Sequence, residues 1–138
     1  MEGQLSTYTF LDEYRQHISP AISAIDVLLK SADYPLGVSE VADALDIDAG
    51  EVASIAAAIG CDAIDRMAFV AIMSRGSSRI CRLFKRESAA GSPPTYTAAQ
   101  IAYIYNLDTR IVEDAYDKLR IKEATPFTMS LVFSQIPY

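Results

Sequence analysis

The strongest constraint on the fold of this chain is an apolar pattern that occurs twice, with the two copies sixty residues apart. In the first copy the apolar or small positions are Val41, Ala42, Leu45, Ile47, Val52 and Ile59. In the second copy they are Ile101, Ala102, Tyr105, Leu107, Val112 and Leu119. The spacing within each copy is typical of two helices separated by a tight turn. Because such a repeat is one supersecondary unit used twice, we predict a mainly α fold built on two related helix pairs.

The length of the chain limits the number of domains. Its 138 residues suffice for one ordinary domain or for two very small ones, and 51% hydrophobic with 22% charged residues is a globular composition. The clearest linker is the segment 89–94, which ends in Pro93-Pro94. We expect residues 1–90 to hold the N-terminal helices, the first helix pair and a basic helix. Residues 91–138 should hold the second helix pair and share one core with the first region.

Two further features bear on the cellular compartment. No apolar run approaches the roughly 20 residues that span a bilayer, and the first ten residues lack the basic and apolar regions of a signal peptide. Cys61 and Cys81 do not form a CxxC or a Cys/His spacing. We therefore expect a cytoplasmic protein without a membrane partner, in which both cysteines are reduced and pack as small apolar groups.

The N-terminal region is expected to form a pair of helices. Thr9 and Asp12 have the spacing of a capping box at a helix start. Ser19-Pro20 predicts the end of this first helix and the start of a second, with Ser19 as N-cap. We expect Ile25, Leu28 and Leu29 of the second helix to pack on the first helix pair.

Capping residues predict where the helices of each pair begin and end. In the first pair they are Ser39, Asp48 with Glu51, and Gly60. In the second pair they are Thr97 with Gln100, Asn106 as a left-handed turn residue, and Asp108. Ala42 and Ala102 should be buried where the helices cross, and Ile47 and Leu107 should be buried at the turns.

The segments 67–73 and 127–133 follow the two helix pairs, and their pattern is ambiguous. Each is either a helix or a short wing strand. Residues 127–133 alternate apolar and small polar side chains as a strand does, whereas the preceding Thr125-Pro126 is a strong helix start. We favour the helix for both segments.

Both helix pairs resemble the helix-turn-helix motif of bacterial transcriptional regulators. The resemblance rests on EVADALDIDAGEVASI (40–55) and QIAYIYNLDTRIVEDA (100–115), which place small or apolar residues as that superfamily does. It covers the two motifs only and points to no particular family within the superfamily. Both copies lack glycine at the turn, where they carry Asp46 and Asn106. The resemblance implies that the second helix of each pair enters the major groove of DNA, with its first residues on base edges.

The two second helices differ in the side chains they offer to DNA. In the first copy the outward positions are small: Ala49, Gly50, Ala53, Ser54, Ala57 and Ala58. Such a face suits packing against another helix better than base reading. In the second copy Thr109 and Arg110 stand at the helix start, where Arg can bind guanine through two hydrogen bonds. Glu113, Asp114 and Asp117 share that surface, so a solvated face of mixed charge is the alternative.

Charge is unevenly distributed along the chain, whose net charge is −6. Residues 1–74 carry twelve acidic and three basic side chains. The positive charge between residues 75 and 90 comes from Arg75, Arg79, Arg82, Lys85 and Arg86, which we call the basic stripe. On a helix, Arg79, Arg82 and Arg86 share one side. The basic stripe is therefore a candidate phosphate-binding surface, and docking against the acidic first half or a partner is the alternative.

No arrangement of residues in the sequence indicates catalysis. His17 is the single histidine, so a histidine pair for metal or a Ser-His-acid set with a spare base is not available. The glycines are too scattered to form a phosphate-binding loop, and Asp46 and Asp48 lack the glycine and glutamate of a calcium loop. We expect no enzyme, no catalytic residue, no metal site and no cofactor.

Two functions of different classes fit these observations. In the first, the chain is a regulator-like protein that binds double-stranded DNA through Thr109, Arg110 and the basic stripe. In the second, it is an interaction module that retains the helix-turn-helix scaffold and binds another protein or itself without binding DNA.

Overall fold

The computed structural model describes residues 8–31 and 33–138, and most of these residues are helical. The mainly α fold is therefore confirmed. No strand occurs among the described residues, whose pairing of extended backbone is limited to isolated bridges. Within the same ranges, no helix has both the length and the apolar character needed to cross a membrane.

The chain divides into two compact units, and each unit is described by itself. The first unit holds the described part of Met1–Ile18 together with Glu87–Tyr138, and the second unit holds Ser19–Arg86. The division between Arg86 and Glu87 lies close to the boundary expected after residue 90. The segment up to Ile18 belongs with the second helix pair, although the sequence places it with the first.

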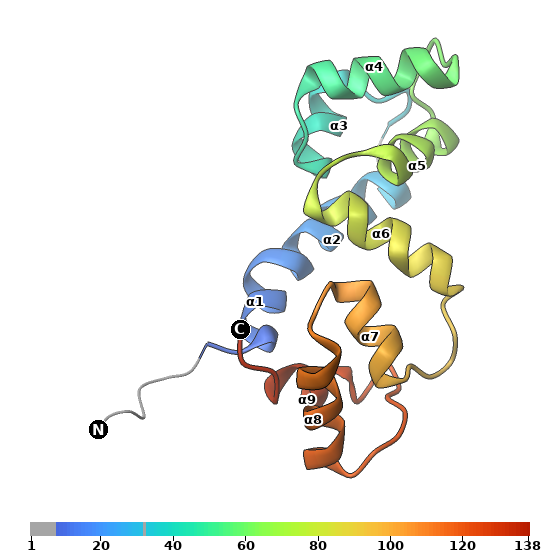
Figure 1. Ribbon diagram of the computed structural model, residues 1–138. Coiled ribbons are helices and arrows are strands. Elements are labelled where there is room, and N and C mark those ends of the chain that lie inside the picture. The colour runs from blue at the N-terminus through green and yellow to red at the C-terminus, as the bar shows by residue number, and fades with distance from the viewer. Residues whose placement is uncertain (1–7, 32) are drawn as a thin grey trace. The chain divides into compact units, whose positions relative to one another are not determined.

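Figure 1 labels the helices of both units. In the first unit they are α1 (Phe10–Glu13), the π-helical turn η1 (Tyr14–Ile18), α7 (Ala98–Tyr105), α8 (Thr109–Leu119) and α9 (Met129–Ser134). In the second unit they are α2 (Ser19–Ser31), α3 (Val38–Leu45), α4 (Ala49–Ile59), α5 (Arg66–Arg75) and α6 (Arg79–Ala90), whose last residues belong to the first unit.

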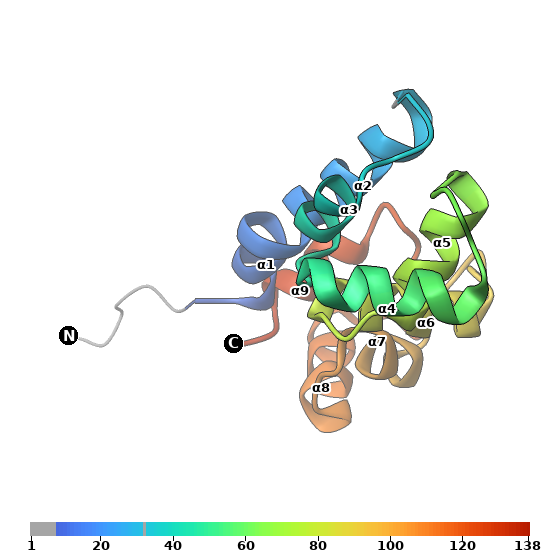
Figure 2. The ribbon, with the colours of Figure 1, turned by 90° about the horizontal axis from the view of Figure 1, so that it is seen from above.

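The helix pair α3–α4 forms the centre of the second unit. Helix α2 packs against α3, and α5 packs against α4 (Figure 2). The side chains that this unit buries completely are Val41, Leu45, Val52, Phe69, Ile72 and Cys81. On α2 only Ile25 is buried, whereas Leu28 and Leu29 are half-buried.

The helix pair α7–α8 forms the centre of the first unit. Helix α9 packs against both α8 and α1, and aromatic rings fill the space between them. The ring of Phe10 meets the ring of Phe133 edge-on, with centroids 4.8 Å apart. Tyr105 lies 5.0 Å from Phe133 and 5.6 Å from Phe10, again ring edge to ring face. This unit therefore has an aromatic core, whereas the core of the second unit is mainly aliphatic.

The backbones of the two helix pairs repeat each other at an interval of sixty residues. Asp46 and Asn106 end α3 and α7 in the left-handed conformation, with φ of 55° and 56°. Gly60 and Arg120 end α4 and α8 in the same way. A bridge then joins the two flanks of each pair, Leu36 to Ile64 and Tyr96 to Ala124. The repeat is thus present in the backbone, while the role of either pair as a regulator-type motif stays a prediction.

Burial at the repeated positions agrees with the sequence pattern in part. Ala42 and Ala102 are buried, as expected where the helices of a pair approach each other. The expected burial of the two turn residues is wrong, because Ile47 and Leu107 are only half-buried. Each turn side chain therefore lies at the edge of its core rather than inside it.

Most of the predicted helix caps are confirmed. Reciprocal capping boxes start α1 at Thr9 with Asp12 and α7 at Thr97 with Gln100. Asp48 and Asp108 cap α4 and α8 through their side chains.

Two capping predictions in the first pair are wrong. Helix α3 starts one residue after Gly37, not at Ser39, because the Glu40 carboxylate accepts a hydrogen bond from the Gly37 N–H at 3.0 Å. Glu51 does not complete a capping box, because its carboxylate instead accepts two hydrogen bonds from Ser77, each 2.7 Å long.

The predicted break at Ser19-Pro20 is also wrong. Residues 10–31 are helical without interruption, and Ser19 lies inside this run. The π-helical turn η1 lies immediately before Pro20. Proline lacks an N–H and its ring collides with a preceding carbonyl, so a wider turn at this point accommodates both defects.

The two ambiguous segments contain helices. Helix α5 covers 67–73 completely, so the helix is confirmed there and a wing strand is wrong. In the second segment α9 begins at Met129, three residues later than Thr125-Pro126 indicates. The side chains of Thr125 and Thr128 bind each other's backbone N–H, at 3.3 Å and 2.9 Å, and hold residues 125–128 in a turn.

Candidate functional site

The basic stripe lies along α6 and at the end of α5. Helix α6 buries Ile80, Cys81 and Leu83, so its remaining sides face outward. Four stripe residues are exposed, and one, Arg86, is half-buried. The exposed ones are Arg75, Arg79, Arg82 and Lys85. The outward direction predicted for this basic helix is thus present in the fold.

Hydrogen bonds anchor the start of α6 to the first helix pair. The Ser78 Oγ donates to the Leu45 carbonyl at 2.6 Å and accepts from the Cys81 N–H at 3.3 Å. Ser77 binds the Glu51 carboxylate at the first turn of α4. Because these contacts connect α6 to both helices of the pair, the basic stripe has a fixed position on the second unit.

Close backbone packing adds to this anchor. Gly76 lies so near Cys81 that a Cβ at this position would overlap the cysteine Sγ. Cys81 is completely buried, and burial raises the pKa of its thiol. Cys81 therefore packs as a small neutral group, as the sequence predicts, whereas Cys61 is half-buried.

Thr109 and Arg110 lie in the first unit, at the N-terminal end of α8. Both are exposed, as a base-reading position requires. The Asp108 carboxylate also lies at this end and accepts hydrogen bonds from the Arg110 and Ile111 N–H groups, at 2.9 Å and 3.4 Å. An acidic cap here opposes a phosphate, because it occupies the N–H groups and adds negative charge. Thr109 and Arg110 belong to one unit, and the basic stripe belongs to the other.

The other exposed side chains of α8 carry charges of both signs. They are Glu113, Asp114, Asp117 and Lys118. The sequence prediction that carboxylates share this surface with Arg110 is confirmed. Attraction of DNA to α8 therefore depends on Arg110 against three acidic neighbours.

The outer face of α4 has the small side chains that the sequence predicts. All six predicted outward residues are exposed: Ala49, Gly50, Ala53, Ser54, Ala57 and Ala58. Asp48 caps this helix at its N-terminus through a 2.7 Å hydrogen bond from the Glu51 N–H. A surface without long polar side chains cannot form the paired hydrogen bonds that read bases.

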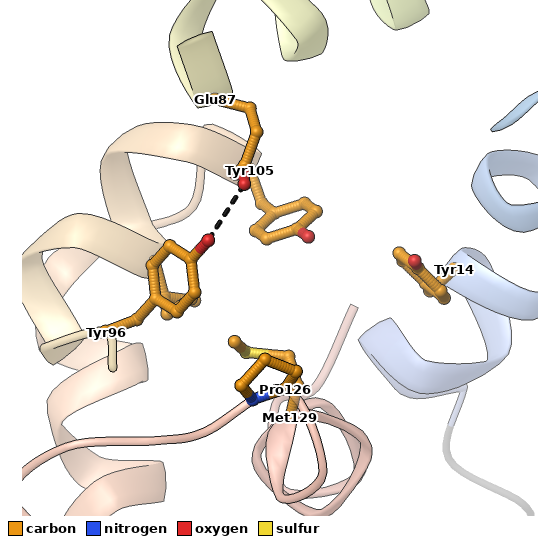
Figure 3. Close-up of a pocket in the computed structure, with 7 residues that line it drawn as sticks. Tyr14, Glu87, Tyr96, Tyr105, Pro126 and Met129 are labelled. Carbon is orange, nitrogen blue, oxygen red and sulfur yellow. Dashed lines mark hydrogen bonds between the residues drawn. The ribbon is translucent and has the colours of Figure 1, made fainter. Parts of the chain in front are cut away.

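A cavity of about 310 Å³ lies in the first unit, where the sequence indicates no site. Three tyrosines and one carboxylate form its polar lining, as Figure 3 shows. They are Tyr14, Tyr96, Tyr105 and Glu87. The apolar lining is Ile101, Pro126 and Met129. The Tyr96 hydroxyl donates a hydrogen bond to the Glu87 carboxylate at 2.9 Å.

All three cavity tyrosines are stabilised in the neutral form. Burial raises the pKa of Tyr105 strongly, and the nearby Tyr14 and Glu87 add to this effect. Burial and the Glu87 carboxylate raise the pKa of Tyr14. Burial and the hydrogen bond to Glu87 raise the pKa of Tyr96. At neutral pH the cavity thus combines three neutral rings with one carboxylate.

The single histidine lies on η1 in the same unit. The side chain of His17 is 60% exposed, and its Nε2 lies 3.9 Å from the Glu13 carboxylate one turn earlier. Glu13 is the buried acidic residue of this unit and also accepts a 2.9 Å hydrogen bond from the Tyr8 hydroxyl. In the described part of the chain, no three potential metal ligands lie together.

Comparison of the chain with protein-family profiles, with curated proteins and with solved structures finds no match. The function is therefore inferred from the side chains and surfaces themselves.

Proposed function

We propose that this chain is a cytoplasmic, regulator-like helix-turn-helix protein that binds double-stranded DNA. The observation that supports this proposal most directly is the basic stripe, which presents four exposed cationic side chains on and beside α6. Hydrogen bonds between α6 and the first helix pair hold these charges in place. A fixed row of guanidinium groups suits the phosphates of a duplex.

In this proposal the residues of the two units have separate roles. Arg79, Arg82 and Arg86 contact phosphates, and these contacts supply attraction without reading the base sequence. Arg110 at the start of α8 contacts a base edge, and Thr109 contacts the adjacent phosphate. The net charge of −6 opposes the approach of any polyanion, so we expect weak binding that decreases steeply with salt.

The test is a titration of the full chain with a fluorescent DNA duplex at several salt concentrations. Each phosphate contact contributes about −0.9 to the slope of log K against log salt. The Arg79→Ala/Arg82→Ala variant should therefore reduce this slope by about 1.8. Both side chains are exposed, so neither change should unfold the protein.

A matched control removes two positive charges outside the proposed surface. Arg15 and Lys122 are also exposed, and the Arg15→Ala/Lys122→Ala variant changes the net charge by the same amount. This control should leave the salt slope within about 0.3 of the wild-type value, because it removes no phosphate contact. Absence of binding at low salt, or equal slopes in both variants, would contradict the DNA proposal.

The outer face of α4 favours a second candidate function, self-association through this helix. Gly50, Ala53 and Ala57 are exposed and share one side of α4, so a second copy of the helix can approach its backbone closely. Sedimentation equilibrium of the full chain tests this candidate. A dimer that the Ala53→Glu/Ala57→Glu variant dissociates would support it, and a monomeric wild-type protein at high concentration would exclude it.

A further inference from the structure

The cavity of the first unit has the lining of a binding site for a cation. Its walls come from η1, α6, α7, α9 and the segments beside the bridge between Tyr96 and Ala124. The rings of Tyr14, Tyr96 and Tyr105 stand around the hollow, and Glu87 lies at one end of it (Figure 3). At about 310 Å³ the hollow is at the lower limit of pockets that hold small molecules.

The charge of this lining selects against most ligands. Glu87 is its charged group, and none of the described residues that line it is basic. An anion would meet the carboxylate without a compensating cation. A purely apolar molecule would bury the carboxylate and the phenol hydroxyls without new hydrogen bonds, which is costly. An organic cation avoids both penalties, since it pairs with the carboxylate and is attracted to the faces of the rings.

Contacts within the unit hold Tyr96 in place before any ligand binds. Its backbone N–H and carbonyl both bond to Ala124 at 2.8 Å, and its carbonyl also accepts a 2.8 Å bond from the Tyr116 hydroxyl. Its own hydroxyl is held by Glu87. Tyr96 therefore keeps both its ring and the carboxylate in position.

The other two rings are fixed by the aromatic core. Tyr105 packs against Phe10 and Phe133, and the rings of Tyr14 and Tyr105 meet at 6.2 Å in an edge-to-face arrangement. Tyr14 also lies 5.2 Å from the ring of Phe133. A lining that is already ordered loses little conformational entropy on binding, which favours a weak ligand.

We propose that this cavity binds a small organic cation, specifically a molecule with an alkylated ammonium group. The ammonium group lies among the three tyrosine rings and pairs with Glu87, while its alkyl groups contact Met129 and Pro126. This site is independent of the proposed DNA surface, because none of its residues belongs to the basic stripe or to α8.

The test is a nuclear magnetic resonance titration of the full chain with choline. The matched probe is 3,3-dimethylbutan-1-ol, which has the shape of choline but a carbon atom in place of the charged nitrogen. Choline should shift the ring signals of the cavity tyrosines in a saturable way, with a dissociation constant of about 1–10 mM. The neutral alcohol should bind at least about tenfold more weakly, because it lacks the cation–π and charge-pair attraction.

The Glu87→Gln variant tests the carboxylate. Glutamine has the same shape and can still accept the hydrogen bond from Tyr96, so the fold of the cavity should persist. Choline affinity should decrease by at least about fivefold because the charge pair is lost, whereas affinity for the neutral alcohol should stay the same. Glu113→Gln on the exposed face of α8 removes one equal charge and should leave choline binding unchanged.

A second variant separates the ring from its hydroxyl. Tyr105→Phe keeps the aromatic face and should retain choline binding within about twofold. Equal binding of choline and the neutral alcohol, or unchanged choline affinity in a folded Glu87→Gln variant, would overturn the proposal. Absence of saturable shifts up to about 50 mM choline, where a site of this strength is filled, would overturn it as well.

Discussion

At the scale of single residues, the two helix pairs solve the same backbone problem with different side chains. The residue that ends the second helix of each pair is left-handed, with φ of 72° at Gly60 and 56° at Arg120. Glycine adopts this conformation without strain, whereas a residue with a Cβ loses about 1–2 kcal/mol. The second pair therefore carries backbone strain that the first pair avoids.

Replacing Arg120 by glycine should relieve this strain. We expect the Arg120→Gly variant to be about 0.5–1 kcal/mol more stable, since the gain in the folded state exceeds the greater flexibility of an unfolded glycine. Urea unfolding measures the change. The converse variant, Gly60→Ala, should lose about 1 kcal/mol through strain alone, because a Cβ there meets nothing within 4 Å. A less stable Arg120→Gly protein would show that the arginine side chain makes a contact worth more than the strain.

Gly76 illustrates a different requirement, which is space. Its φ of −66° suits any residue, but an added Cβ would overlap the Cys81 sulfur. The Gly76→Ala variant should therefore be destabilised by about 1–3 kcal/mol through overpacking. In a Cys81→Ala background the same change should cost less, because the sulfur is gone. Equal losses in both backgrounds, measured by urea unfolding, would place the conflict somewhere other than at Cys81.

At the scale of elements, Leu45 links three of them. Its side chain is completely buried at the end of α3, and its carbonyl accepts the Ser78 hydroxyl at the start of α6. The Leu45→Ala variant leaves the carbonyl in place and removes only the side chain, so it should lose about 2–5 kcal/mol. Leu131 on α9 is 55% exposed, and Leu131→Ala should lose less than about 1 kcal/mol. A Leu45→Ala loss below about 1 kcal/mol would mean that the core tolerates this change by repacking.

The sequence predicts elements well where one local signal decides and poorly where two signals compete. The spacing of Val41, Leu45 and Val52 locates α3 and α4, because those side chains have no alternative to burial. Ser19-Pro20 misleads, since a π-helical turn lets the helix continue through a proline. Ser39 misleads because the Glu40 carboxylate already binds the N–H of Gly37 and starts the helix earlier. Such choices depend on side-chain geometry that periodicity does not contain.

The candidate sites were predictable to different degrees. The basic stripe is visible in the sequence, because Arg79, Arg82 and Lys85 are neighbours on one helix. The cavity is not visible, because Tyr14, Glu87 and Tyr105 come from distant parts of the chain and only tertiary packing brings them together. A count of tyrosines signals an aromatic core but does not show which rings face a hollow.

At the scale of the whole molecule, the distribution of buried tyrosines makes stability depend on alkaline pH. Burial raises the pKa of Tyr116 to about 12 from its ordinary value of 10.0, and it also raises the pKa of Tyr14, Tyr96 and Tyr105. All four belong to the first unit. The unfolded chain ionises these groups at lower pH than the folded chain does, so ionisation favours unfolding.

We therefore expect the first unit to lose stability as the pH rises. The contribution of Tyr116 is fully present below pH 10 and is lost as the pH rises toward about 12. Urea unfolding across this range, with tyrosinate absorbance followed in the folded protein, measures the effect. The Tyr116→Phe variant should be less stable at neutral pH, because it loses the hydrogen bond to the Tyr96 carbonyl, but its stability should decrease less on alkalinisation. Folded-state ionisation of every tyrosine near pH 10 would contradict this expectation.

The matching bridges have a consequence for the history of the chain. Leu36 and Tyr96 each donate a backbone hydrogen bond to a partner at the far flank of their helix pair, and the number of residues enclosed is the same in both copies. Inserting or deleting one residue between the flanks would move donor and acceptor out of register. Substitution at the enclosed positions meets no such barrier, since the first copy is rich in alanine and the second in tyrosine and charge. This is the record expected of a duplicated segment whose length was constrained by selection while its side chains diverged.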